Sequence, residues 1–214
     1  MTSLRASILP VTPFQQNCTF LFDDETKSGV VIDPGGEVDR IRAAIDEIGM
    51  TVERIVLTHG HIDHAGGAAE LKEALGVEIV GPHLEDAPMM MRLEDQAKMF
   101  GLPVGSVRNV KADRWLEEGE TLTMAGVDFD VYHCPGHSPG SVAFVNQAMN
   151  FAIVGDVLFR GSVGRTDLPG GDHDTLMASI KDKLLPLGDD IAFLCGHGPG
   201  STFGTERRSN PFLV

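Results

Sequence analysis

The chain alternates short apolar runs with segments whose apolar residues recur every three or four positions. The runs at 54–58 and 77–81 have the length of buried strands, whereas the apolar positions of 37–48 follow one face of a helix. Strands and helices recur in two successive sets along the chain. The pattern therefore predicts two sheets packed face to face, with helices on the outside.

The individual elements follow from the same periodicities and from the glycines and prolines that interrupt them. A break is expected at Pro88 in one long helical segment, whose run of three methionines is interpreted as core filling, with a flexible lid as the alternative. Strands are expected at 8–14, 17–22, 28–33, 54–58, 77–81, 120–126, 127–134, 141–146, 150–156 and 191–196, and helices at 37–48, 66–75, 84–100, 176–185 and 205–210.

Length and composition narrow the class of protein. A chain of 214 residues is long enough for one large core, and we expect a single domain over 1–214 that is a monomer or a homodimer. The net charge is 17 − 31 = −14, which argues against a nucleic-acid partner. No segment has the length of a membrane span or the pattern of a signal peptide, and the three cysteines are scattered, so we expect a cytoplasmic protein without a membrane partner.

Potential metal-binding side chains are most concentrated at 58–67, THGHIDHAGG, where three histidines and an aspartate fall within six residues. A strand leads into this segment and a helix is expected to follow, so it is predicted to be a turn at the carboxyl end of a strand, where α/β proteins bind ligands. Imidazole and carboxylate groups suit zinc, iron or manganese. His59 and His61 can share one metal ion, which leaves Asp63 and His64 free to face a second.

Three further candidates follow the same rule, since each comes directly after an apolar strand and beside a glycine. They are His137 in CPGHSPG, Asp156 in VGDV and His197 in CGHGPG. Glycine lets the backbone bend so that the neighbouring side chain points away from the sheet edge. We therefore expect these strand ends to converge with the histidine cluster on one point.

Together these motifs resemble the metallo-β-lactamase superfamily over about residues 14–197. The resemblance implies an α/β fold of the αββα type, with two mixed β-sheets, helices on the outer faces and metals at one edge of the sheets. It implies that a carboxylate, Asp156, bridges two metal ions. Residue by residue, it also implies that the first ion is bound by His59, His61 and His137, and the second by Asp63, His64 and His197.

The two divalent ions that the resemblance implies indicate a hydrolase. We expect zinc first, with iron or manganese as alternatives. A bound ion lowers the pKa of water to about 7, so that hydroxide is available at neutral pH. The other ion polarises the carbonyl of the substrate, and Asp63 or Asp156, as the catalytic carboxylates, takes up a proton. The expected reaction is hydrolysis of an ester, thioester, lactone or amide.

Within the superfamily, the segments 11–22, 30–36 and 58–67 resemble glyoxalase II, the hydroxyacylglutathione hydrolases, and 160–176 resembles a single-domain bacterial subgroup. The resemblance implies a small thioester or ester substrate of the S-lactoylglutathione type. Only 214 − 197 = 17 residues follow His197, so we expect no C-terminal glutathione-binding helical domain and a more open pocket. Recognition of glutathione therefore stays an open question at this point.

Two alternatives remain beside this interpretation. Persulfide dioxygenases share the fold and a loop similar to 164–167, and they hold one iron with residues that here would be His59, His137 and Asp156. These three residues are present under either interpretation, and the hydrolase is favoured by the 160–176 loop and the GHGP ending. A purely structural zinc site is the other alternative, although it would need only four ligands.

Several residues near the motifs are weighed as substrate contacts or as supports. Phe14 is expected beside the mouth of the site or at a hairpin tip, and Arg160 and Arg165 either orient an anionic substrate or lie on the surface. Asp33 is expected to support a ligand histidine. The remaining residues are interpreted as structural: Tyr132, His83, His133, His173, the N-cap Asp172 and the buried thiols Cys18, Cys134 and Cys195.

Overall fold

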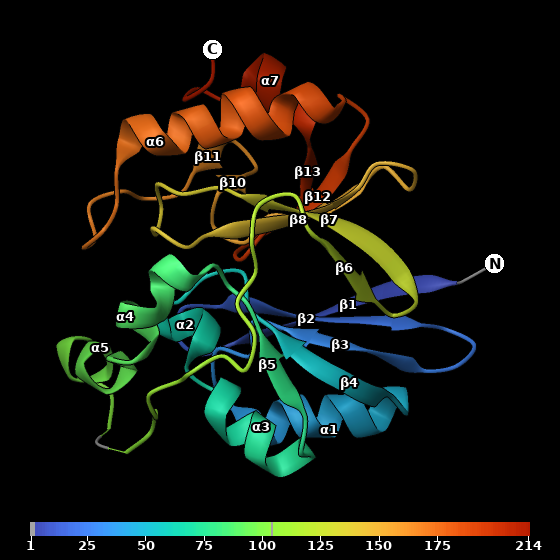
Figure 1. Ribbon diagram of the computed structural model, residues 1–214, viewed down its shortest axis with the longest axis vertical. Coiled ribbons are helices and arrows are strands. Elements are labelled where there is room, and N and C mark those ends of the chain that lie inside the picture. The colour runs from blue at the N-terminus through green and yellow to red at the C-terminus, as the bar shows by residue number, and fades with distance from the viewer. Residues whose placement is uncertain (1–2, 104) are drawn as a thin grey trace.

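A computed structural model describes residues 3–103 and 105–214, and its two β-sheets pack face to face between two helical layers (Figure 1). The first sheet has the order β1-β2-β3-β4-β5, formed by β1 (Leu4–Val11), β2 (Gln16–Asp23), β3 (Ser28–Ile32), β4 (Thr51–Val56) and β5 (Glu78–Val80). The second has the order β13-β12-β9-β8-β7-β6, formed by β6 (Thr121–Met124), β7 (Val127–His133), β8 (Val142–Asn146), β9 (Phe151–Ile153), β12 (Ala192–Leu194) and β13 (Ser201–Thr202).

Both sheets are mixed. In the first, β1, β2 and β3 pair antiparallel, and β3, β4 and β5 pair parallel. In the second, β9 and β12 are parallel and their other neighbours antiparallel. A separate hairpin of β10 (Leu158–Phe159) and β11 (Ser162–Val163) follows β9. The α/β class with two mixed sheets is therefore confirmed.

The helices cover the outer faces of the sheets, as Figure 1 shows. α1 (Val38–Ile48) and α3 (Ala68–Leu75) lie on the first sheet, and α6 (His173–Ala178) and α7 (Phe203–Ser209) on the second. After α6 the helix continues with π-type and 3-10 turns to Leu187. The short helices α2 (Ile62–Ala65), α4 (Ala87–Met90) and α5 (Leu93–Met99) gather beside one edge of the sheets. None of the helices in the described ranges has the length and apolarity that crossing a membrane requires.

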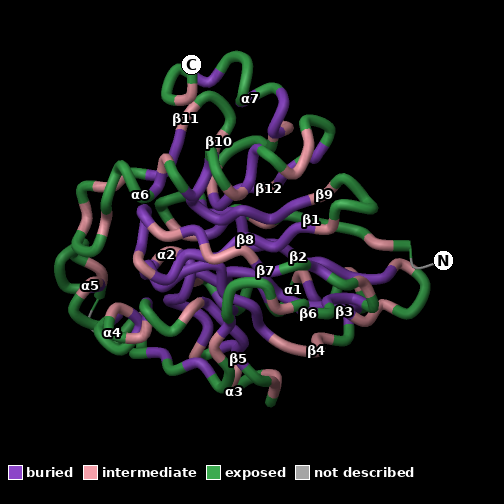
Figure 2. The backbone as a smooth tube through the Cα atoms, turned by 45° about the horizontal axis from the view of Figure 1, so that its top comes forward, coloured by how far each residue is buried: buried purple, intermediate pink, exposed green. Residues whose placement is uncertain are grey.

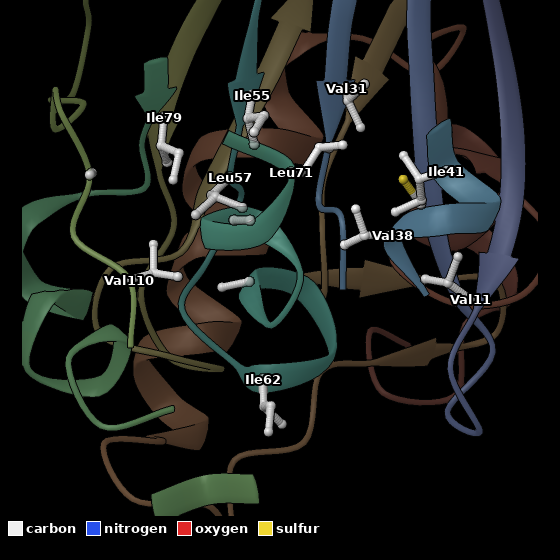
Figure 3. Close-up of a cluster of buried hydrophobic side chains, with 14 of the residues drawn as sticks. Val11, Val31, Val38, Ile41, Ile55, Leu57, Ile62, Leu71, Ile79 and Val110 are labelled. Atoms are coloured by element: carbon white, nitrogen blue, oxygen red, sulfur yellow. The ribbon is translucent and has the colours of Figure 1, made fainter. Parts of the chain in front are cut away.

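The core has three layers because successive side chains of a strand point to opposite faces. In β3, Val31 packs into the cluster under α1 and α3, together with Ile41 and Leu71 (Figure 3). Its neighbours Val30 and Ile32 pack between the two sheets. A third cluster lies between the second sheet and α6, and Figure 2 shows the buried strands running through the middle of the molecule.

Several local predictions differ from the structure. The strand expected at 8–14 is β1, which covers Leu4–Val11 and is followed by a turn at 12–15. The helix expected from Gly66 begins earlier, at Ile62, and is divided into α2 and α3, so Asp63 and His64 lie on a helix and not on a turn. Pro88 does not break its segment but lies in the first turn of α4, where proline's missing N–H is harmless; the interruption comes at 91–92. The two-residue strands β10, β11 and β13 are too short to produce a sequence pattern.

Candidate metal centre

The predicted ligand side chains converge at one edge of the two sheets. His59 and His61 follow β4, and Asp63 and His64 lie in α2, directly behind them. The other three come from the second sheet: His137 follows β7, Asp156 follows β9 and His197 follows β12. Because β9 and β12 are parallel neighbours, their carboxyl ends meet, and Gly196 N–H donates to the carbonyl of Gly155 at 2.8 Å.

The converging side chains form two groups, each of which offers ligand atoms within 4.8 Å of one another. One group is His59, His61 and His137, and the other is Asp63, His64 and His197, which are the same residues as the two predicted ligand sets. In the first group, Nε2 of His137 lies 2.9 Å from Nδ1 of His61 and 3.2 Å from Nε2 of His59. Ring nitrogens that face one another so closely suit a shared cation.

Hydrogen bonds on the outer side of the rings determine which nitrogen points inward. Nδ1 of His64 donates to Asp33 Oδ2 at 2.9 Å, and Nδ1 of His137 donates to the carbonyl of Arg165 at 2.8 Å. Nδ1 of His59 lies 3.1 Å from Thr58 Oγ1, and Nδ1 of His197 lies 3.1 Å from the carbonyl of Phe14. Each of these four rings therefore turns Nε2 toward the centre, the arrangement in which outer acceptors orient metal-binding histidines.

Asp156 lies between the two groups. Its Oδ1 is 3.3 Å from Nε2 of His64, and its Oδ2 is 3.6 Å from Nε2 of His137 and 3.5 Å from Nε2 of His197. Oδ1 of Asp156 and Nε2 of His64 are both buried without a hydrogen-bond partner. Buried polar groups are normally paired, so these two atoms point to a missing partner. Imidazole nitrogens with carboxylates on both sides are a donor set that fits two divalent ions.

The charges of the cluster favour cations. Burial and the neighbouring ring of His137 lower the pKa of His61 to about 3, so that this ring is neutral and has a free lone pair. Burial alone would lower the pKa of His64, but the carboxylates of Asp156, Asp63 and Asp33 outweigh it and raise the pKa. The space around Nε2 of His64 therefore favours positive charge.

Asp33 and Gly196 support the cluster from behind. Asp33 Oδ1 accepts a hydrogen bond from Thr58 N–H at 2.7 Å, and its Oδ2 accepts bonds from Thr58 Oγ1 and from His64, so the expected support of a histidine is confirmed. At Gly196, a Cβ atom would lie 2.0 Å from Asp156 Oδ1 and 2.5 Å from His64 Cε1. Only glycine allows the turn before His197 to pass this close to the centre.

Asp86 is a support that the sequence analysis missed. It is fully buried, and its carboxylate accepts hydrogen bonds from Gly60 N–H at 2.7 Å, Ser138 Oγ at 2.8 Å and Gly140 N–H at 2.6 Å. Burial raises its pKa, although these hydrogen bonds act in the opposite direction. Gly60 lies between His59 and His61, and Ser138 follows His137, so one carboxylate connects both loops of the first group. No sequence motif identifies it, because its partners lie 26 to 54 residues away.

A pocket of about 1060 Å³ opens above the cluster. Phe14, Arg160 and Arg165, the three predicted substrate contacts, all line it, with His61, Asp63, His137, Asp156 and His197. Arg165 is paired with Asp167 through two contacts of 2.7 Å, whereas Arg160 forms no ion pair within the described ranges. The segment of α4 and α5 supplies a further wall. Met89, for which a lid was the alternative interpretation, lines the pocket, together with Met99 and Phe100, which the sequence analysis did not assign to the site.

Most of the residues interpreted as structural lie away from the centre; Cys195 is an exception, because its Sγ donates to the carbonyl of His197 at 3.1 Å. The rings of His83 and His133 stack at 4.0 Å on each other, and with Glu85 they form a small cluster at the side of the pocket. Tyr132 is half-buried against the core, and His173 is exposed. Asp172 caps α6 by accepting from Thr175 N–H at 2.7 Å, as expected. Of the three methionines, Met90 alone is core; Met89 lines the pocket and Met91 is 58% exposed.

Known proteins share this arrangement at family level. A profile of the metallo-beta-lactamase superfamily matches residues 11–197. The hydroxyacylglutathione hydrolase GloC of Haemophilus influenzae is 47% identical over 98% of this chain and 98% of its own length. Among solved structures, the B3 metallo-beta-lactamase BLEG-1 is similar with a TM-score of 0.89 and 35% identity over 98% of this chain and 100% of that chain. TTHA1623 in a di-iron-bound form is similar with a TM-score of 0.86 and 40% identity, over 97% and 100%.

Proposed function

The chain belongs to the metallo-beta-lactamase superfamily as a metal-dependent hydrolase, and from this premise we propose that it hydrolyses a small thioester of the S-lactoylglutathione type. The observation that carries the proposal is the pair of residue groups on either side of Asp156, at the floor of an open pocket. The 47% identical relative named as a hydroxyacylglutathione hydrolase supports the substrate class.

We propose that His59, His61 and His137 hold one divalent ion and Asp63, His64 and His197 the other, with Asp156 shared between them. When bound, the ions supply a water of lowered pKa and a Lewis acid for the thioester carbonyl. Zinc is the first choice, and iron is supported by the di-iron form of a 40% identical relative. The three buried, free thiols suit a reducing compartment, so we propose the cytoplasm.

The carboxylates of the chain handle the protons. Asp63 is the more exposed of the two catalytic carboxylates, at 18% of its side chain against 10% for Asp156, and both line the pocket. We assign to Asp63 the proton that the attacking water loses. The water oxygen adds to the carbonyl carbon, the carbon–sulfur bond breaks, and Asp63 returns its proton to the departing sulfur, which leaves as a thiol. His197 Nε2 lies 3.2 Å from Asp63 Oδ2, so these two proposed ligands of the second ion are adjacent.

Substrate orientation is assigned to three residues at the pocket mouth. Phe14 lies above the cluster, and its carbonyl lies 3.1 Å from Nδ1 of His197. Arg160, whose guanidinium has no ion-pair partner in the described part of the chain, suits a carboxylate of the thiol part. Arg165 is already paired with Asp167, so its contribution should be smaller. We expect Arg160→Gln to raise the KM for S-lactoylglutathione more than Arg165→Gln does.

The decisive experiment compares His197→Ala with the matched control His173→Ala, since His173 is exposed and lies outside the centre. Protein purified without added metal should contain about two ions per chain and hydrolyse S-lactoylglutathione. His197→Ala should lose one ion and most of the activity, and the control should keep both.

A different result would favour the dioxygenase alternative. His197 is dispensable if one iron is held by His59, His137 and Asp156. The proposal of a hydrolase would be overturned by three results together: one iron per chain, oxygen uptake with glutathione persulfide, and an unaffected His197→Ala variant.

A further inference from the structure

One side of the pocket is an apolar wall that lies next to the candidate metal centre. The acyl wall, as we call it, consists of Phe14, Met89, Met99 and Phe100. The rings of Phe14 and Phe100 meet edge to face with their centroids 5.5 Å apart, which joins the turn after β1 to the end of α5.

The acyl wall is held at a fixed position relative to the cluster. Gln96 Oε1 accepts a hydrogen bond from Ile62 N–H at 3.1 Å, and Gln96 Nε2 donates to the carbonyl of Met89 at 3.2 Å. Leu93 and Ala97 bury the inner face of α5 in the core. Ile62 is the first residue of α2 and lies between His61 and Asp63. The Gln96 side chain therefore connects α4 and α5 to the segment that carries these two candidate ligands. A ligand on the wall would therefore have a defined distance to the reacting carbonyl.

The wall leaves apolar surface in contact with water. Met99 is 78%, Phe100 46% and Phe14 39% exposed. Covering such surface is favourable in proportion to the area removed from water. Methionine side chains also adapt to ligands of different shape. The same pocket is lined by Arg160, which forms no ion pair with any residue that the structure describes, so the pocket as a whole suits a molecule with one apolar and one anionic part.

We propose that the acyl wall binds the acyl group of the substrate, and that the preferred thioesters have an unbranched apolar acyl chain longer than lactoyl on an anionic thiol. This inference rests on the proposed thioesterase function and adds the acyl class to it. The wall is partly open, so each added methylene should raise kcat/KM by about two- to fourfold, the range between half and full burial of one methylene.

The test measures kcat/KM for S-acetyl-, S-lactoyl-, S-butanoyl- and S-hexanoylglutathione with the metal-loaded enzyme. We expect a rise from acetyl to hexanoyl. Met99→Gln keeps the length of the side chain but makes it polar, and it should flatten this rise. The matched control is Met91→Gln, because Met91 is another exposed methionine, in the turn between α4 and α5, and does not line the pocket. The control should keep the wild-type slope.

The outcomes separate this inference from the proposed function. If acetyl and lactoyl thioesters are hydrolysed but kcat/KM is constant or falls with chain length, the acyl wall has no such role and the thioesterase function stands. If the slope is present but Met99→Gln and Met91→Gln retain it equally, the chain binds elsewhere and the inference is refuted. If none of the four thioesters is hydrolysed, the proposed function itself fails.

Discussion

Replacing Asp86 by Asn is expected to weaken metal binding without unfolding the protein. The carboxylate accepts from Gly60 N–H and Ser138 Oγ through Oδ2 and from Gly140 N–H through Oδ1. An amide has one acceptor oxygen and one donor group. Whichever way Asn turns, its NH₂ must face the N–H of either Gly60 or Gly140. One loop of the first histidine group therefore loses its anchor.

The magnitude follows from two opposing effects. A buried N–H without a partner costs about 1–3 kcal/mol. For a chain of this size that alone corresponds to a fall in Tm of roughly 2–12 °C. Burial of the negative charge is itself unfavourable, as the raised pKa of Asp86 indicates, and Asn removes that cost. The Tm of the metal-free protein should therefore fall by less than the lost hydrogen bond alone would cause. Metal affinity should fall by about 10–100-fold, as is usual when a residue that supports a ligand is lost.

The assay is competition for zinc with a chromophoric chelator, together with thermal unfolding in the presence of a strong chelator. Asp46→Asn is the matched control, because Asp46 is exposed on α1 and its side chain forms no hydrogen bond or ion pair within the described ranges. Equal zinc affinity in Asp86→Asn and Asp46→Asn would refute the positioning role. A large loss of Tm in the metal-free protein with unchanged affinity would show that Asp86 is only structural.

Three further results are expected. Removing metal with a chelator should lower Tm, because buried Asp156 Oδ1 and His64 Nε2 are left without partners. About two equivalents of zinc should restore the Tm, and an unchanged Tm would contradict the inference that the donor set fits two divalent ions. Leu71→Ala should lower the free energy of unfolding by about 2–5 kcal/mol in denaturant titrations, since Leu71 is fully buried under the first sheet. Asp172→Ala should cost about 0.5–2 kcal/mol in the same assay through loss of the α6 N-cap, and no loss would exclude that cap.

The sequence predicted correctly those features that arise from residues close together in the chain. The strands that form the three core layers have the apolar runs that predict them. The clustering of His59, His61, Asp63 and His64 is local as well. Local pattern was insufficient for Pro88, since the same residue can end one helix or begin the next.

By itself, the sequence determined the fold class and predicted the local group of candidate ligands, His59, His61, Asp63 and His64, because strand periodicity and the spacing of histidines are properties of neighbouring residues. Only the tertiary structure decided that Asp86 connects two loops and that the residues of α5 reach the pocket beside Phe14. Those contacts join residues far apart in the chain, and their distances depend on how two sheets and the segment of α4 and α5 pack together. No periodicity along the chain records that packing.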